Sequence, residues 1–124
     1  MKAAVYPLDT SAEYFFDEGC FITELCNTPD DEQVSIARAR LEPGKTTRWH
    51  FLRGITERYV VVSGSGRVEV GDLEPQQVGP GDVVLIPAQQ RQRIATVGDE
   101  DLVFLAICSP RFLPDAYVDC EDAQ

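Results

Sequence analysis

Two side chains near the middle of the sequence, His50 and Glu57, are of types that move protons or hold metal ions in proteins. An imidazole and a carboxylate within hydrogen-bonding distance can act as an acid–base couple, and both groups are ligands for divalent transition metals. His50 is the only histidine of the chain, and a lone histidine is more often structural or exposed. On the surface, Glu57 would form a salt bridge of little energetic value. Whether His50 and Glu57 are functional or structural depends on whether both side chains point into the same protein interior.

The alternation of side chains along a strand indicates which residues share a face with this couple. Side-chain direction repeats every second residue, so Glu57 and Tyr59 point the same way. Val60 and Val62 then point away from them. We therefore name His50, Glu57 and Tyr59 as candidate catalytic residues. The candidate substrate-binding residues share a face with His50 or begin a later strand, and they are Arg48, Gln92, Ile94 and Thr96.

Short strands must position these residues. Apolar or alternating runs recur along the chain, separated by turns rich in glycine, proline and aspartate. This pattern predicts an all-β fold, an antiparallel β-barrel or jelly roll whose interior has room for one small ligand. The expected strands are residues 21–26, 34–41, 46–51, 58–62, 67–70, 83–86, 92–97 and 102–108.

The middle of the chain carries a spaced set of residues that is also found in a known family. Gly44 is followed by five residues and then His50, with Leu52 two positions further on. Glu57 and Gly64 complete the set. The first motif of cupins reads glycine, five residues, His-x-His, three or four residues, glutamate, six residues and glycine. Every spacing agrees here, and Leu52 replaces the second histidine.

A second cupin motif follows in the right order. Gly81 is followed by five residues and then Pro87, as in cupins. Cupins next place a glycine, a histidine and an asparagine, and this chain has Gln89, Gln92 and Thr96 at those positions. The spacing of the motif is therefore kept while its side chains differ.

The chain thus resembles the cupin superfamily, as a small single-domain protein of the Cupin_2 type. The resemblance covers residues 34–108 and implies a cupin-type barrel, the double-stranded β-helix. In cupins, three histidines and one glutamate of these motifs hold a divalent ion, usually iron, manganese, nickel, copper or zinc. The corresponding positions here carry His50, Leu52, Glu57 and Gln92. Leucine cannot bind a metal, so the resemblance implies a metal site that is weakened or lost.

The formal net charge of −10 argues against nucleic acid and anionic membranes as partners. Arg38 and Arg40 share one face of an expected strand, and the arginine fork suits carboxylates and phosphates. The pattern leaves open which face of that strand is interior. If the arginines face inward, we expect them to bind an anionic ligand; otherwise they pair with the acidic ends of the chain.

We expect the chain to form one domain over residues 1–124. It divides into an N-terminal arm, a motif-bearing barrel core and an acidic C-terminal extension, at residues 1–19, 34–108 and 109–124. The apolar runs are too short for a signal peptide or a membrane span, so we expect a cytoplasmic protein with reduced cysteines. We also expect a homodimer, as is common for cupins, because Val60 and Val62 point away from the cavity.

Three functions are compatible with these observations, and the residues leave open whether the chain is an enzyme. The first is a barrel that binds a small molecule, anionic if an arginine lines it, with metal binding weakened or lost. The second is a mononuclear metal-dependent enzyme of the dioxygenase, isomerase or lyase type, with His50, Glu57 and Gln92 as ligands. The third is a non-catalytic dimeric module, which a leucine at a ligand position favours.

Overall fold

The computed structural model describes residues 1–121. Within that range the chain is built from strands and two short 3-10 helices, η1 (Thr10–Ala12) and η2 (Pro114–Ala116). None of the described helices is long and apolar enough to cross a membrane. The strands are β1 (Tyr14–Phe16), β2 (Cys20–Cys26), β3 (Ser35–Leu41), β4 (His50–Leu52), β5 (Thr56–Ser63), β6 (Ser65–Val70), β7 (Gln76–Val78), β8 (Val83–Ile86), β9 (Gln92–Val97), β10 (Leu102–Ser109) and β11 (Tyr117–Asp119).

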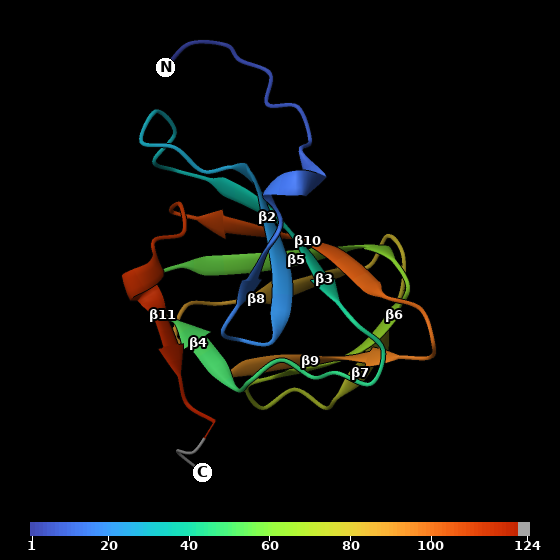
Figure 1. Cartoon of the computed structure of the whole chain (residues 1–124). Helices are drawn as coiled ribbons and strands as arrows, with labels where there is room; N and C mark the ends of the chain where they lie inside the picture. The colour runs from blue at the N-terminus through green and yellow to red at the C-terminus, as the bar shows by residue number, and fades with distance from the viewer. Residues whose placement is uncertain (122–124) are drawn as a thin grey trace.

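The strands form two antiparallel sheets that enclose a common interior (Figure 1). In the described part of the chain, one sheet has the order β1-β2-β3-β10-β5-β8 and the other has the order β11-β4-β9-β6-β7. Several strands that are neighbours in space are distant in sequence, since β3 pairs with β10 and β6 pairs with β9. The predicted all-β jelly roll is therefore confirmed.

The expected strand at residues 46–51 differs from the observed one, because β4 begins only at His50. The preceding segment bonds elsewhere: Thr46 forms an isolated bridge with Ala95, and the Arg48 amide donates to the Glu18 carbonyl at 2.8 Å. Three strands of three residues each, β1, β7 and β11, were not predicted. Strands this short leave too little alternation to be recognised in a sequence.

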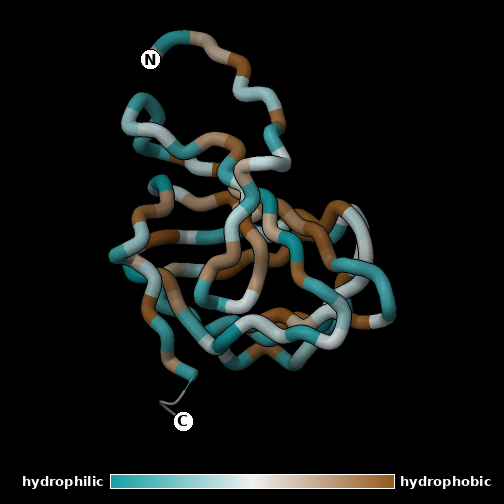
Figure 2. The backbone as a smooth tube through the Cα atoms, in the orientation of Figure 1, coloured by the Kyte–Doolittle hydropathy of each residue, from teal (hydrophilic) through white to brown (hydrophobic). Residues whose placement is uncertain are grey.

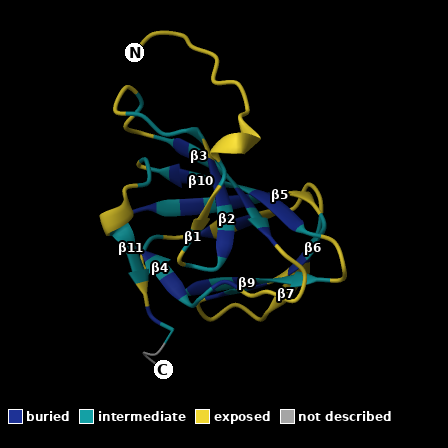
Figure 3. Cartoon of the chain, viewed as in Figure 1, coloured by how far each residue is buried: buried dark blue, intermediate teal, exposed yellow. Residues whose placement is uncertain are grey.

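Apolar side chains from both sheets pack together as the core. Figure 3 shows buried segments, in dark blue, on strands of both sheets. The strands that contribute them are also the apolar stretches of the backbone in Figure 2. The alternation predicted for β5 is observed, because Tyr59 and Val61 are buried while Val62 is exposed. The largest buried apolar side chains are Phe104, Leu41, Ile86, Ile94 and Leu102.

Apolar side chains also lie on the outer surface at the edge of the six-stranded sheet. Val62 of β5 and Val83 and Leu85 of β8 are all more than half exposed. Such a surface is compatible with the expected homodimer. The dimer stays a prediction. Light scattering at micromolar protein concentration would measure the molar mass and so test it.

β3 directs its arginines outward. Arg40 forms ion pairs with Glu13 and Asp101 at 2.7 and 3.2 Å, and Arg38 lies 3.7 Å from Glu13. The opposite face of this strand is small or apolar and belongs to the core, with Ala37, Ala39 and Leu41. The open question about β3 is thereby answered, because the arginines pair with acidic residues outside the barrel.

The two glycines that bound the first motif have the same backbone conformation in different surroundings. Gly44 has φ +76° and Gly64 has φ +78°. A Cβ atom at Gly44 would meet no heavy atom within 4 Å, whereas at Gly64 it would lie 2.3 Å from the Asp101 carbonyl oxygen. The turn between β5 and β6 therefore requires glycine for space as well as for conformation.

We expect Gly44→Ala to lower the free energy of unfolding by about 1 kcal/mol, the cost of the positive φ alone. Gly64→Ala should lower it by about 2–4 kcal/mol, because the backbone must also shift to relieve the overlap. Urea unfolding of both variants measures the difference. Equal losses for the two would contradict the close packing of this turn.

Candidate functional site

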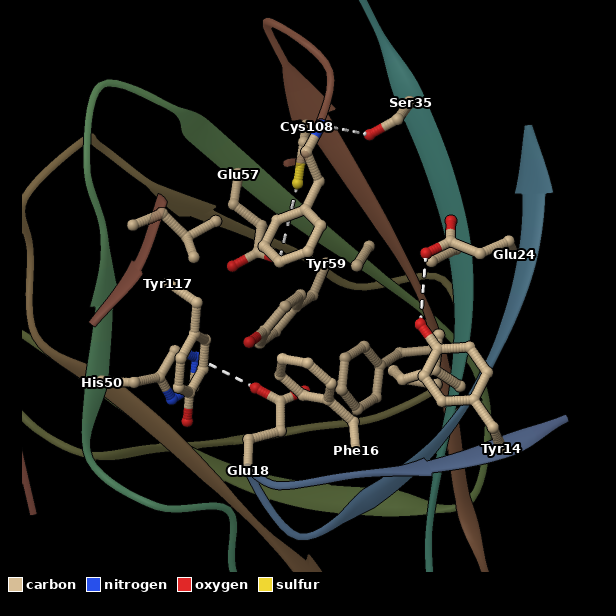
Figure 4. A pocket seen from close by; sticks show the side chains of 17 residues that line it. Tyr14, Phe16, Glu18, Glu24, Ser35, His50, Glu57, Tyr59, Cys108 and Tyr117 are labelled. Atoms are coloured by element: carbon tan, nitrogen blue, oxygen red, sulfur yellow. Dashed lines mark hydrogen bonds and ion pairs between the residues drawn. The ribbon is translucent and has the colours of Figure 1, made fainter. Parts of the chain in front are cut away.

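A cavity lies inside the barrel and has walls from both sheets (Figure 4). Its volume is about 50 Å³, which is room for a few waters, and a larger ligand would extend through its open side. Its lining includes one imidazole, three carboxyl groups and six aromatic rings. These are His50; Glu18, Glu24 and Glu57; and Tyr14, Phe16, Tyr59, Phe104, Phe112 and Tyr117.

The carboxyl group of Glu57 is buried and hydrogen-bonded at both oxygens. The Gln92 amide nitrogen donates to Glu57 Oε1 at 3.0 Å, and the Cys108 thiol lies 3.7 Å from Oε2. The Tyr59 hydroxyl in turn donates to the Gln92 amide oxygen at 2.5 Å. Glu57 and Tyr59 share a face of β5, and Gln92 reaches them from β9 in the other sheet. The interior thus satisfies this buried polar group, as is usual in folded proteins.

The ring of His50 has a partner at each nitrogen. Nδ1 lies 2.6 Å from the Arg48 carbonyl oxygen, which can only accept, so Nδ1 carries a proton. Nε2 lies 3.2 Å from Glu18 Oε2, and this contact requires one further proton on either group. The Cys20 thiol donates to the other Glu18 oxygen at 2.9 Å, and Tyr117 stacks on the imidazole with ring centres 5.0 Å apart. His50 and Glu18 therefore form a proton-sharing pair in a fixed orientation.

The pKa of Glu57 is raised from its ordinary value of 4.5 to about 7, chiefly by burial and also by the nearby charge of Glu18. The charge of His50 and the hydrogen bonds from Gln92 and Cys108 act in the opposite direction. A carboxyl group with a pKa near neutrality can both accept and release a proton at physiological pH, as acid–base chemistry requires. Burial also raises the pKa of the Cys108 thiol, so this cysteine stays protonated.

The structure brings the candidate catalytic residues to one place. His50, Glu57 and Tyr59 all line the cavity, and the fully buried Gln92 connects Glu57 to Tyr59. The side chain of Leu52 lines the same cavity at the position of the missing ligand. These positions support the prediction, made from the alternation of side chains, that the candidate catalytic residues face one interior. Their roles in binding or catalysis stay predictions.

The other candidate binding residues lie away from the cavity. Arg48 is paired with Asp119, outside the barrel, and Arg38 and Arg40 face outward from β3. On β9, Ile94 is packed in the apolar core, and the Thr96 hydroxyl donates to a backbone carbonyl of β3 at 3.0 Å. The face assigned to β9 was correct, but core side chains fill the barrel beyond Gln92. None of these five residues is among those that line the cavity. Their roles in binding stay predictions, and the condition for an anionic ligand, arginines that face inward from β3, is not met.

Several lining residues were missed by sequence reasoning because they lie outside the two motifs. Glu18 follows β1, Glu24 is on β2, and Tyr117 begins β11. Phe16 belongs to an aromatic run, Tyr14 to Phe16, that the sequence shows plainly. This run was the one available signal, since aromatic residues in an otherwise polar, acidic arm indicate that the arm packs against something.

The residues at the family's metal-ligand positions do not fit a metal ion. Leu52 has no donor atom, the Gln92 amide is engaged by Glu57 and Tyr59, and both nitrogens of His50 have protein partners. Transition-metal sites in proteins generally have at least three protein ligands. Over residues 1–121, no group of three or more histidine, cysteine, aspartate or glutamate side chains is placed to hold a metal.

Known proteins with sequences or structures similar to this chain support the cupin fold described above. A family model described as "Cupin domain" matches residues 37–108. The chain is similar to the structure of KdgF from Halomonas sp., with a TM-score of 0.77 and 17% identity over 90% of this chain and 96% of that one. It is also similar to one part of oxalate decarboxylase from Lactobacillus farciminis, solved as a formate complex. That match has a TM-score of 0.74 and 22% identity, over 86% of this chain and 32% of that one.

Among curated proteins, the chain is similar to a glucose-6-phosphate isomerase of Pyrococcus furiosus. The two are 28% identical over 131 aligned residues, which cover 86% of this chain and 69% of that protein. The structural matches have low sequence identity and therefore support a shared architecture, whereas function depends on the residues inside each barrel.

The raised pKa of Glu57 makes stability depend on pH. A proton is held more tightly in the folded state, near pH 7, than in the unfolded chain, near pH 4.5. The stabilisation from this proton is therefore complete below pH 4.5 and is lost as pH rises through 7. In the wild type, we expect the free energy of unfolding to fall by about 3 kcal/mol between pH 4.5 and pH 8. In Glu57→Gln this decrease should be absent, because the amide cannot ionise. Urea unfolding of wild type and variant across this range measures it, and parallel pH profiles would contradict the buried titration of Glu57.

Proposed function

This chain belongs to the cupin domain family, and we propose that its barrel binds a small organic molecule beside Glu57 without a resident metal ion. One observation carries the proposal: the side chain at the position of the family's third histidine, Gln92, connects Glu57 to Tyr59 by two hydrogen bonds. An amide in this arrangement has its oxygen and one N–H directed at protein groups. Leu52, at another ligand position, supplies apolar wall instead of a donor atom.

The form of the cavity supports binding of a small molecule. It is lined mostly by aromatic and aliphatic side chains, with a few polar groups directed into it from different strands. This combination is typical of small-molecule sites, where apolar walls supply affinity and polar groups fix orientation. Burial of Glu57 and His50 also separates their protons from bulk solvent.

A second candidate function is proton transfer without metal. It is favoured by Glu57, whose pKa is raised to about 7, and by the Glu18–His50 pair on the same cavity. Two such groups could remove a proton from one carbon of a ligand and return it to another, the step of an isomerase. The Pyrococcus furiosus relative is called a glucose-6-phosphate isomerase. A sugar phosphate is not favoured here, because neither lysine nor arginine is among the lining residues.

We expect protein purified without a histidine tag or added chelator to contain far less than one ion of iron, manganese, nickel, copper or zinc per chain. The physical reason is that the residues at the ligand positions already have protein partners or lack donor atoms. Elemental analysis by mass spectrometry measures the metal content. His50→Ala should leave the content unchanged within error.

A matched variant shows whether the barrel could hold a metal at all. Leu52→His combined with Gln92→His restores the family's ligand set, and we expect it to gain close to one nickel or zinc ion per chain after addition and dialysis. Circular dichroism checks that the variant keeps its strands. One tightly held ion per wild-type chain, lost in His50→Ala, would overturn the proposal and favour the metal-dependent enzyme.

A further inference from the structure

The charged groups that line the cavity are predominantly acidic. Glu18 reaches it from the turn between β1 and β2, Glu24 from β2, and Glu57 from β5. The one basic side chain, His50, is already paired with Glu18. Because the whole chain carries a net charge of −10 as well, the potential inside the cavity disfavours anions and attracts cations.

Aromatic rings stand between these carboxyl groups. Phe16 is edge-on to Tyr117 and Phe112, with ring centres 5.1 and 6.4 Å apart, and Tyr59 packs on Phe104 with centres 4.4 Å apart. Figure 4 shows Phe16, Tyr59 and Tyr117 around one hollow, with the carboxyl groups of Glu18 and Glu57 at its sides. Ring faces attract cations, and concave sets of rings are how proteins recognise quaternary ammonium groups.

One polar atom of the lining has no partner. The Tyr117 hydroxyl is buried, and no hydrogen bond to it is formed within the described residues. Its ring is fixed against His50, so the hydroxyl cannot easily turn toward solvent. An unsatisfied buried hydroxyl is costly, but almost none of its surface is open to the cavity, so it does not determine the class of ligand.

The entrance of the cavity has the same character as its interior. Tyr14 and Glu24 are exposed members of the lining, and the Tyr14 hydroxyl donates to Glu24 at 3.4 Å. A cation approaching from solvent therefore meets a carboxylate and a ring before it reaches Glu18 and Glu57.

We propose that the ligand of this cavity is a small organic cation, an amine or quaternary ammonium compound. The carboxyl groups balance its charge, and the rings enclose its methyl or methylene groups. A bare metal ion is a poorer fit, because it would leave the aromatic walls without a partner. This inference rests on the proposed function, since it names the ligand class of the same cavity.

Three probes of matched shape test the charge of the ligand. Choline is the cation, 3,3-dimethyl-1-butanol is its uncharged isostere with carbon in place of nitrogen, and 3,3-dimethylbutanoate is an anion of similar shape. Binding to wild-type protein is measured by isothermal titration calorimetry, with sodium chloride added to equal ionic strength. We expect choline to bind with a Kd roughly tenfold or more below that of the alcohol, and we expect no measurable binding of the anion.

Variants localise the binding. Glu24→Gln and Phe16→Leu should each raise the Kd for choline several-fold, because one removes a carboxylate at the entrance and the other a ring of the wall. Glu74→Gln is the matched control, since Glu74 is exposed between β6 and β7 and its substitution changes net charge equally. We expect it to leave the Kd unchanged. Thermal unfolding checks that each variant is folded.

The outcomes separate this inference from the function on which it rests. Equal or tighter binding of the alcohol would overturn the cationic ligand while leaving a small-molecule barrel in place. Absence of choline binding, or an equal loss in Glu74→Gln, would overturn the inference too, the latter by showing attraction to overall charge alone. A resident metal ion in the elemental analysis would overturn the proposed function itself, whatever the probes do.

Discussion

The carboxyl group of Glu57 lies inside a β-barrel, and much of the interior is arranged around the cost of keeping it there. An unpaired buried carboxylate is strongly unfavourable. In this chain the cost is met by hydrogen bonds from Gln92 and Cys108 and by a pKa raised to about 7, which leaves the group protonated part of the time. Tyr59 then fixes the Gln92 amide from the other side. A metal ion in such a barrel would offer compensating positive charge, whereas here shared protons and neutral donors take that role.

The ends of the chain complete the interior that the motifs begin. β1 and β11 add to different sheets, and Glu18 and Tyr117 approach His50 from these two ends. The ring of His50 is therefore held in part by residues outside the region that resembles the family, while its Nδ1 is bound by the Arg48 carbonyl within that region. The terminal segments determine the polarity, aromatic character and size of the cavity as much as the barrel core does. The fold alone therefore does not indicate the ligand.

The jelly roll could be predicted because its signals are local: turns at Gly64 and Gly81, and alternation that places Glu57 and Tyr59 on one face. The same alternation predicted that His50 and Gln92 face the interior. The partners of His50 could not be predicted, because Glu18 follows β1 and Tyr117 begins β11, and each of these strands has only three residues. The inner face of β3 could not be predicted either, because alanines alternate with arginines along this strand. The ion pair between Arg40 and Glu13 shows which face is outside.

The protonation state of His50 tests the central claim most directly, and because His50 is the only histidine, 15N-histidine labelling yields a single imidazole in the NMR spectrum. The account predicts a protonated Nδ1 that donates to the Arg48 carbonyl, and an Nε2 that shares a proton with Glu18. Both nitrogen resonances should stay in place when one equivalent of zinc or nickel is added. An unprotonated Nδ1, or a shift of Nε2 on adding metal, would show that His50 is free to act as a metal ligand and would contradict the account.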